Sequence, residues 1–175
     1  MKNSPHNGVT VTAQGRRELH GFWRRLVTVI RRYPRLGQVV QRAYRRLQPR
    51  FTIGVIGVLV NEDRVLLVEH LFHPYTPWGL PGGWIGRREN PAQTVEREFL
   101  EETGLRVRAV RPLIVQQPKL WRGHMDVVYL MEPAGPLEPI HLCHELLGYR
   151  WTPCDDLPKL VPVHTQAIRA AFEEK

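Results

Sequence analysis

The sequence predicts an α/β or α+β sandwich over residues 51–175, preceded by a basic helical arm over residues 1–50. Runs of β-branched residues alternate with helical patterns after residue 51, which is typical of layered folds that mix strands and helices. The charge also changes there. Residues 1–50 contain twelve Lys and Arg and one acid, a net charge of +11, whereas residues 51–175 contain thirteen bases and sixteen acids, a net charge of −3. We therefore expect one domain with an electrostatically distinct arm.

The arm contains two runs of apolar residues at helical spacing, which predict two short amphipathic helices over residues 16–48, joined near Tyr33 and Pro34. The first run comprises Leu19, Phe22, Trp23, Leu26, Val27, Ile30 and Tyr33, and the second Leu36, Val39, Val40, Ala43, Tyr44 and Leu47. Two interpretations stay open. We expect the stripes to pack on the following domain or on a second subunit of a homodimer; the alternative is a surface for RNA or an anionic membrane.

In the domain that follows, turn and capping residues separate the predicted strands and helices. Strands are predicted over residues 51–60, 64–70, 105–115, 125–131 and 146–152, and helices over residues 91–103 and 163–174. Asn61-Glu62-Asp63 predicts a hairpin turn, and the two prolines of residues 73–79 predict a loop. Asn90 is the expected N-cap of the first helix, and Gly104 its expected end.

Composition and segment lengths exclude several classes of protein. The longest uncharged apolar run, residues 53–60, is far shorter than the roughly 20 residues that a membrane-spanning helix requires. The first residues lack the apolar core of a secretory signal, and the two cysteines are a poor basis for a disulfide framework. We therefore expect a cytoplasmic protein.

The predicted helix over residues 91–103 carries three acids on one face. Glu98, Glu101 and Glu102 are spaced i, i+3 and i+4, so they span about 100° of the helix surface. Two carboxylates about 5 Å apart repel by about 3 kcal/mol at an effective dielectric constant near 20. A hard divalent cation would turn that repulsion into affinity, because Mg²⁺ prefers carboxylate oxygens. A solvated acidic face is the alternative.

A longer pattern surrounds this helix and resembles the Nudix box, G-x5-E-x7-R-E-U-x-E-E-x-G-U, where U is a bulky apolar residue. Every specified position is filled, by Gly83, Glu89 and the segment Arg97-Glu98-Phe99-Leu100-Glu101-Glu102-Thr103-Gly104-Leu105. The aromatic Phe99 at an apolar position is a mild departure. The lead-in over residues 80–83, together with Trp151 and residues 155–158, also looks like the family, so the resemblance extends from about residue 51 to the end.

The resemblance implies a Nudix-like α/β/α sandwich with a mixed sheet, and an enzyme that uses Mg²⁺ or Mn²⁺. The implied reaction is hydrolysis of a diphosphate linkage in a nucleoside diphosphate joined to another group. In this interpretation the metal ligands are Gly83, Glu98, Glu101 and Glu102. Glu89 and Arg97 would pair to fix the loop against the helix. The proton acceptor would be a box glutamate, Glu98 or Glu101, or the later Glu145, which lies six residues before Trp151.

The substrate is less well defined by the sequence, because no signature for a particular nucleotide is clear. Phe72, Tyr75 and Trp121 are candidates to stack on a base, and Arg122 and His124 are candidates to meet phosphate. A nucleotide is the expected partner. Two further functions remain open: removal of pyrophosphate from RNA 5′ ends, in which the arm would follow the phosphate backbone, and nucleotide binding without cleavage.

Overall fold

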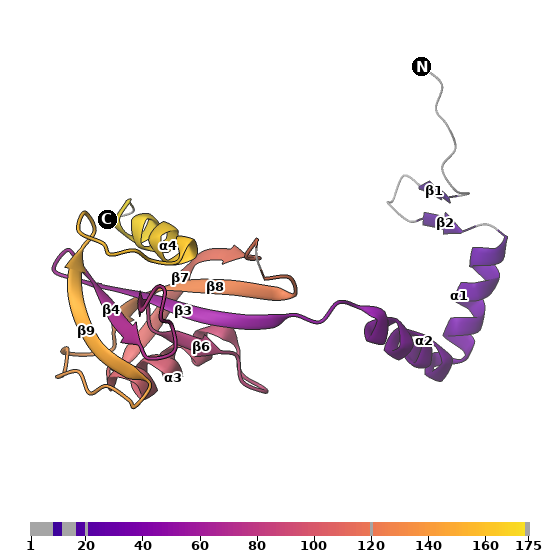
Figure 1. Cartoon of the computed structure of the whole chain (residues 1–175). Helices are drawn as coiled ribbons and strands as arrows, with labels where there is room; N and C mark the ends of the chain where they lie inside the picture. Colours follow the sequence, from indigo (N-terminus) through magenta and orange to yellow (C-terminus); the bar gives the residue numbers. More distant parts are fainter. Residues whose placement is uncertain (1–8, 12–16, 20, 120, 174–175) are drawn as a thin grey trace, which may run out of the picture. The chain divides into compact units, whose positions relative to one another are not determined.

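The computed structural model (Figure 1) describes residues 9–11, 17–19, 21–119 and 121–173. The chain divides into two compact units, with the boundary between Pro49 and Arg50. In the first unit, strands β1 (Val9–Val11) and β2 (Arg17–Leu19) pair antiparallel, and helices α1 (Phe22–Arg32) and α2 (Pro34–Leu47) follow. Within the described ranges, no helix is long and apolar enough to cross a membrane.

The first helix begins later than the sequence predicts. Residues 17–19 form a strand instead of helix, and residue 16 lies outside the described part of the chain. Gly21 precedes α1 with a positive φ of 59°, a conformation that interrupts helical geometry, so the three-residue step from Leu19 to Phe22 does not reflect one helix. Pro34 begins α2 because a first-turn residue needs no N–H.

The second unit is built on a seven-stranded mixed sheet. Its main path runs β5-β4-β3-β8-β7, with β6 paired to β3 and β9 paired to β4; the β3–β8 pair is parallel and the others are antiparallel. The strands are β3 (Thr52–Asn61), β4 (Arg64–His70), β5 (Trp78–Gly79), β6 (Gly82–Trp84), β7 (Val107–Gln116), β8 (His124–Pro133) and β9 (Leu146–Pro153).

Two of these strands contradict or extend the prediction. Trp78–Gly79 pairs with β4, although residues 73–79 are predicted as loop, and Gly82–Trp84 pairs with β3 without any prediction. Strands of two or three residues that contain Gly have no apolar period of their own. Only their tertiary pairing makes them strands, so local pattern could not identify them.

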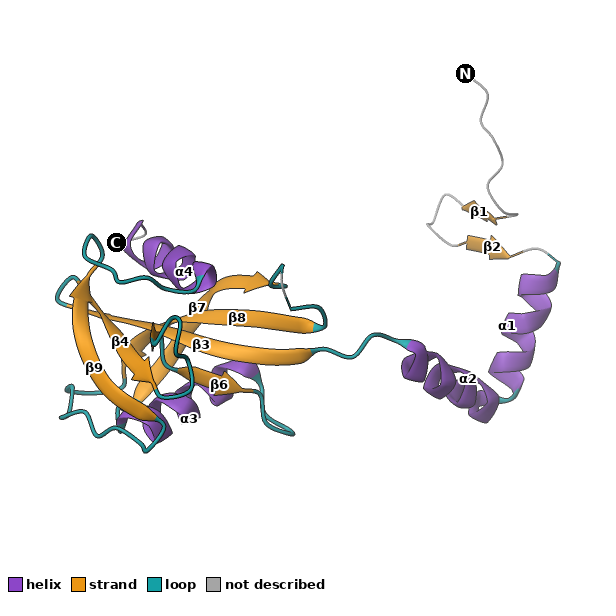
Figure 2. Cartoon of the chain, viewed as in Figure 1, coloured by secondary structure: helices purple, strands orange, loops and turns teal. Residues whose placement is uncertain are grey.

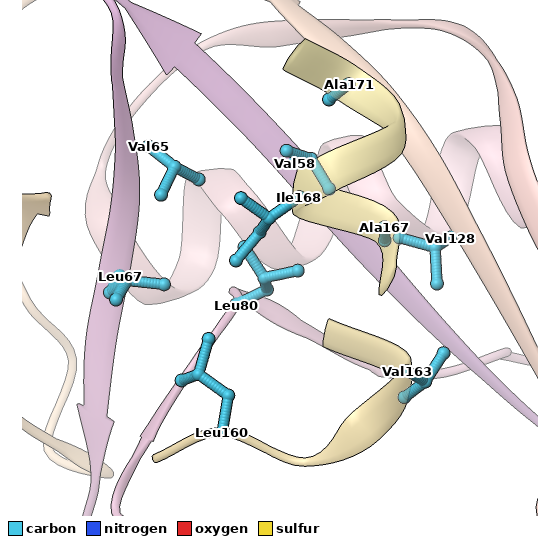
Figure 3. Packing of buried hydrophobic residues seen from close by; sticks show 10 residues of the cluster. All are labelled: Val58, Val65, Leu67, Leu80, Val128, Leu160, Val163, Ala167, Ile168 and Ala171. Carbon is cyan, nitrogen blue, oxygen red and sulfur yellow. The ribbon is translucent and has the colours of Figure 1, made fainter. Parts of the chain in front are cut away.

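One helix covers each face of the sheet, as Figure 2 shows, which confirms the predicted sandwich. Helix α4 (Pro162–Glu173) packs on one face; Glu174, predicted as helical, lies outside the described residues. The core on that side comprises Val58, Val65, Leu67, Leu80, Val128, Leu160, Val163, Ala167, Ile168 and Ala171 (Figure 3). Helix α3 (Pro91–Thr103) packs on the other face, with a core of Val55, Leu59, Leu66, Val95, Phe99, Leu105, Val107 and Met131.

The ends of α3 are fixed as the sequence predicts. The Asn90 side chain accepts from the Gln93 N–H at 2.9 Å, and the Gln93 side chain accepts from the Asn90 N–H at 3.2 Å, which forms a capping box. Gly104 ends the helix in the left-handed conformation, with φ 73°. These two caps fix where the helix that carries Glu98, Glu101 and Glu102 begins and ends.

Gly57 on β3 generates a test of the packing between α3 and the sheet. A Cβ at this position would stand 2.4 Å from Phe99 Cε2 and 2.8 Å from Met131 Cγ. We expect Gly57→Ala to lower the free energy of unfolding by about 1–3 kcal/mol, measured by urea denaturation. Gly135→Ala is the control, since nothing lies within 4 Å of its added Cβ. Equal stability of the two variants would contradict this packing.

Candidate active site

The glycines before α3 let the chain lie directly on two carboxylates of the helix. The Gly82 N–H donates to Glu102 Oε2 at 3.0 Å. A Cβ on Gly83 would stand 2.3 Å from Glu98 Cδ, so any larger residue there would force that carboxylate to move. Strand β6 holds both glycines in place, because Gly83 pairs with Val55 of β3. The structure thus brings Gly83, Glu98 and Glu102 together.

Burial perturbs both of these carboxylates. Glu102 is 9% exposed, and burial, reinforced by the carboxylates of Glu98, Glu145 and Glu101, raises its pKa to about 8, although the Gly82 N–H opposes the shift. Burial also raises the pKa of Glu98, with the Arg97 guanidinium opposing. A buried acid among other acids is costly to ionise in the absence of a cation.

Arg97 is the centre of an ion-pair network at the exposed side of these carboxylates. Its Nε lies 2.9 Å from Glu89 Oε1, and its Nη1 lies 2.9 Å from Glu98 Oε1 and 2.8 Å from Glu101 Oε2. Glu89 also accepts from the Gly86 N–H at 3.1 Å and the Thr94 hydroxyl at 3.0 Å. The hydrogen bond from Arg97 is the main cause that lowers the pKa of Glu89. Glu89 and Arg97 therefore tie the loop to α3.

Glu145 approaches the same helix from a distant part of the chain. The Cys143 N–H donates to the Glu102 carbonyl at 3.1 Å, and the His141 N–H donates to the Thr103 carbonyl at 2.9 Å. These bonds fasten the segment before β9 to the end of α3. The Glu145 side chain is 59% exposed, yet its charge contributes to the raised pKa of Glu102. It is the most accessible acid of this group beside Glu101.

The donor chemistry fits a divalent cation. Carboxylates of Glu98, Glu101 and Glu102 and the carbonyl of Gly83 are hard oxygen donors, and an ion would offset the raised pKa of Glu102. In the part of the chain that the structure describes, no three His, Cys, Asp or Glu side chains already stand at metal-binding positions. Because Arg97 contacts Glu98 and Glu101, these two carboxylates would exchange that contact for the ion.

Two histidines that sequence reasoning missed, His70 and His164, lie against the segment Gly79-Leu80 before the glycine pair. The Leu80 N–H donates to His164 Nδ1 at 3.2 Å, and a Cβ on Gly79 would stand 3.0 Å from His70 Nε2 and 3.1 Å from His164 Cε1. Burial lowers the pKa of each histidine to about 4, so the rings are neutral near pH 7 and His164 Nδ1 can accept. A lone histidine on a helix 84 residues from Leu80 gives no local signal of this contact.

The predicted substrate residues fall into two separate groups. Phe72 and Tyr75 are strongly exposed, at 71% and 90%, on the loop after β4. This loop adjoins the segment of Glu145, because the Leu71 N–H donates to the Glu145 carbonyl at 3.0 Å. His124 is instead the first residue of β8, and Trp121 and the exposed Arg122 lie just before that strand.

The group at β8 is an aromatic cluster. The Trp121 ring stacks on His124 with centroids 4.5 Å apart, and Trp84 meets the Trp121 ring edge-on at 5.5 Å. His124 is buried, with Nε2 3.0 Å from Asp126 Oδ1 and Nδ1 2.9 Å from Thr52 Oγ1. Both of its nitrogens are thus engaged within the protein, which argues against its predicted contact with phosphate. Sequence reasoning missed Trp84, although it directly follows Gly83.

The raised pKa of Glu102 predicts how pH affects stability without metal. The folded chain holds this proton more tightly than the unfolded chain, so the contribution of Glu102 is most favourable below about pH 4.5 and is lost as the pH rises to about 8. In EDTA, we expect the unfolding midpoint of the wild type to fall more steeply between pH 5 and 9 than that of Glu102→Gln. Glu101→Gln should behave like the wild type, since Glu101 is 57% exposed. Parallel curves for all three proteins would refute the shift.

Several known proteins are similar to this chain in sequence or in fold. A hydrolase of CMP-5′-(N-acetyl-N-hydroxy-3-aminopropyl)phosphonate from Streptomyces rubellomurinus is 35% identical over 119 residues, 62% of this chain and 55% of its own length. NAD-capped RNA hydrolase NudC from Salmonella agona is 31% identical over 127 residues, 71% of this chain and 48% of its own. An ADP-ribose pyrophosphatase from Streptococcus suis superposes with a TM-score of 0.60 at 25% identity, covering 73% of this chain and 92% of that one.

The chain spans about half the length of the two curated relatives described above. Residues 49–171 of this chain match the NUDIX domain. These residues contain the box, the sheet, α3 and nearly all of α4. The protein is therefore a member of the Nudix family, and residues 49–171 are its NUDIX domain.

Proposed function

We propose that this protein hydrolyses a diphosphate linkage in a nucleoside diphosphate joined to another group, with Mg²⁺ or Mn²⁺ as cofactor. The observation that carries the proposal is the Glu102 carboxylate, buried with a pKa of about 8 beside Glu98 and within the electrostatic reach of Glu145. A divalent cation would stabilise the ionised form of these carboxylates. The three relatives described above support the substrate class, since their names specify a CMP derivative, an NAD-capped RNA and ADP-ribose.

The residues divide the work of binding the ion. The Gly83 carbonyl and the carboxylates of Glu98, Glu101 and Glu102 are the proposed ligands. A bound ion would neutralise charge on the diphosphate and lower the pKa of the attacking water. Before the ion binds, Arg97 holds Glu98 and Glu101 near the site through ion pairs of 2.8 to 2.9 Å, and its pair with Glu89 keeps Arg97 in place.

Glu145 is the proposed general base. In the reaction the water oxygen bonds to phosphorus, the bridging P–O bond breaks, and the water proton passes to a carboxylate. Glu102 suits this task less well, because it is buried, is a proposed ligand of the ion and accepts from the Gly82 N–H. Glu98 and Glu101 contact Arg97. Glu145 is the exposed acid of the cluster whose carboxylate does not contact Arg97 in the described structure.

Aromatic side chains near both ends of the site are proposed to receive the nucleotide. Trp84 and Trp121 are each about half exposed and meet edge to face, so a flat base can stack on either ring. Trp84 directly follows the proposed ligand Gly83. Arg122 is exposed beside Trp121 and is proposed to meet phosphate. Phe72 and Tyr75 are the alternative stacking residues, on the Glu145 side.

Hydrolysis at the 5′ end of RNA is the second candidate function. It is favoured by the 31% identity to an NAD-capped RNA hydrolase and by the net charge of +11 in residues 1–50, which suits a polyanion. Nucleotide binding without cleavage is the third possibility. Against it stands the full set of box carboxylates, Glu98, Glu101 and Glu102, which a purely binding protein would not need.

Metal removal tests the cofactor and a substrate panel tests the class. We expect turnover of at least one compound among ADP-ribose, sugar nucleotides, nucleoside triphosphates, dinucleoside polyphosphates and 5′-capped or 5′-triphosphate RNA. Turnover should vanish in excess EDTA and return with Mg²⁺ or Mn²⁺, because the acidic cluster needs a cation to act on a diphosphate. Phosphate products resolved by chromatography provide the measurement. Full turnover in EDTA would overturn metal dependence, and inactivity on every compound would favour a binding protein.

Charge-removing variants test the roles of the glutamates. Glu98→Gln and Glu102→Gln should each lower kcat by orders of magnitude with the fold retained, since they keep the shape and remove one ligand charge. Glu145→Gln should lower kcat by about 10²- to 10⁴-fold, the usual range for a general base, while leaving Mn²⁺ affinity nearly unchanged. The exposed Glu138→Gln is the matched control. An unchanged pH–rate profile for Glu145→Gln would instead assign the general base to a glutamate of the Nudix box, Glu98 or Glu101.

A further inference from the structure

Helix α1 separates its apolar and basic residues completely. At 3.6 residues per turn, its six apolar side chains fall within an arc of about 160°, and its four arginines fall on the opposite side within about 120°. The apolar set is Phe22, Trp23, Leu26, Val27, Val29 and Ile30, and the basic set is Arg24, Arg25, Arg31 and Arg32. Such a division is stronger than a helix needs to be soluble, and it is typical of helices that lie at an interface.

Helix α2 repeats this division with a different sequence. Its apolar residues fall within about 140°, and its arginines and glutamines fill about 140° on the other side. The apolar set is Leu36, Val39, Val40, Ala43, Tyr44 and Leu47, and the polar set is Arg35, Gln38, Gln41, Arg42, Arg45 and Arg46. The two helices contact each other near Gly37, where an added Cβ would stand 3.0 Å from Ile30 Cγ2. Each helix therefore contributes one apolar face and one basic face.

The arm does not bury its apolar faces on itself. Neither α1 nor α2 contains a buried residue, and the exposed fractions of Phe22, Tyr44 and Leu47 are 71%, 63% and 83%. An apolar surface of this extent marks a site that another surface covers. A surface that covers these apolar faces must also offer negative charge to the arginines, because residues 21–48 contain eight arginines and no acidic residue.

We propose that α1 and α2 form an interfacial anchor that binds an anionic lipid surface. The apolar faces would enter the boundary between headgroups and acyl chains, and the flanking arginines would contact headgroup phosphates. Phe22, Trp23, Tyr33 and Tyr44 supply the aromatic rings that favour this boundary. The anchor is independent of the hydrolytic site and does not rest on the activity proposed above.

A lipid surface matches both faces of the arm, whereas RNA or a second arm matches one. Single-stranded RNA offers phosphates and flat bases, but it would leave the aliphatic residues Val39, Val40 and Leu47 in water. A second arm offers an apolar face, but its eight arginines would meet another eight across the contact with no acid among residues 21–48 to pair them. An anionic bilayer offers negative charge and apolar depth together.

Vesicle binding by the full chain tests the anchor. Vesicles of phosphatidylcholine alone are compared with vesicles that also contain phosphatidylserine, at low and high salt, and the partition coefficient is measured by co-sedimentation. We expect binding to the phosphatidylserine vesicles at least about tenfold stronger than to phosphatidylcholine, and weakened by salt. Equal binding to both compositions, or no binding to either, would overturn the proposal without the need for any variant.

Paired variants separate lipid from the other partners. Arg25→Gln with Arg32→Gln removes charge, and Trp23→Gln with Val29→Gln removes exposed apolar side chains; each pair should lower the partition coefficient about tenfold. Arg106→Gln with Arg169→Gln removes two exposed arginines of the NUDIX domain and should change it little.

The same variants, with a single-stranded RNA oligonucleotide and light scattering, give the remaining outcomes. Vesicle binding that survives Trp23→Gln with Val29→Gln would overturn the anchor, and RNA binding lost only with the arginines would then assign a polyanion surface. A wild-type dimer that becomes monomeric in the apolar variant would assign the faces to a second copy and likewise refute the proposal.

Discussion

The crowding of carboxylates at one end of α3 is the constraint on which the candidate site depends. Glu102 is buried and Glu98 is half-buried beside it, and burial raises the pKa of Glu102 to about 8, so the protein environment alone disfavours its charged form. Two devices contain the repulsion: the Gly82 N–H, which donates to Glu102, and Arg97, which contacts Glu98 and Glu101. The negative charge of Glu102 is therefore only partly compensated within the protein, and a cation would stabilise it most.

Much of the architecture serves to keep this cluster assembled. The capping box at Asn90 and the left-handed Gly104 fix the register of α3, and Phe99 locks the helix to β3 where Gly57 leaves room for the ring. The bond from Cys143 to the Glu102 carbonyl brings in the segment that carries Glu145. The helix caps, the packing of Phe99 and the bond from Cys143 together hold this end of α3 folded, so the carboxylates cannot move apart by local unwinding of the helix.

The parts that the sequence predicts are those with local signals. Asn90, Pro91 and Gly104 mark the ends of α3 within the chain itself, and the spacing of Glu98, Glu101 and Glu102 identifies their shared face. Strands β5 and β6, the bond from Leu80 to His164 and the stack of Trp121 on His124 all depend on partners far away in sequence. No period or spacing encodes such contacts. The shared acidic face of α3 was therefore predictable residue by residue, whereas the contacts that support it and the aromatic cluster before β8 were not.

In the arm too, local pattern predicts the helices but not the surface that they contact. The apolar periodicity identified both helices and the break at Pro34, but a stripe reports only that a helix has two kinds of face, not which surface covers one of them. What narrows the choice is the charge of the opposite face together with the exposure of the apolar one. Eight arginines without an acid disfavour self-association, and a long aliphatic stripe disfavours a nucleic acid as the sole partner. Each helix combines these two properties, and a single surface that is both anionic and apolar, as proposed above, would satisfy both.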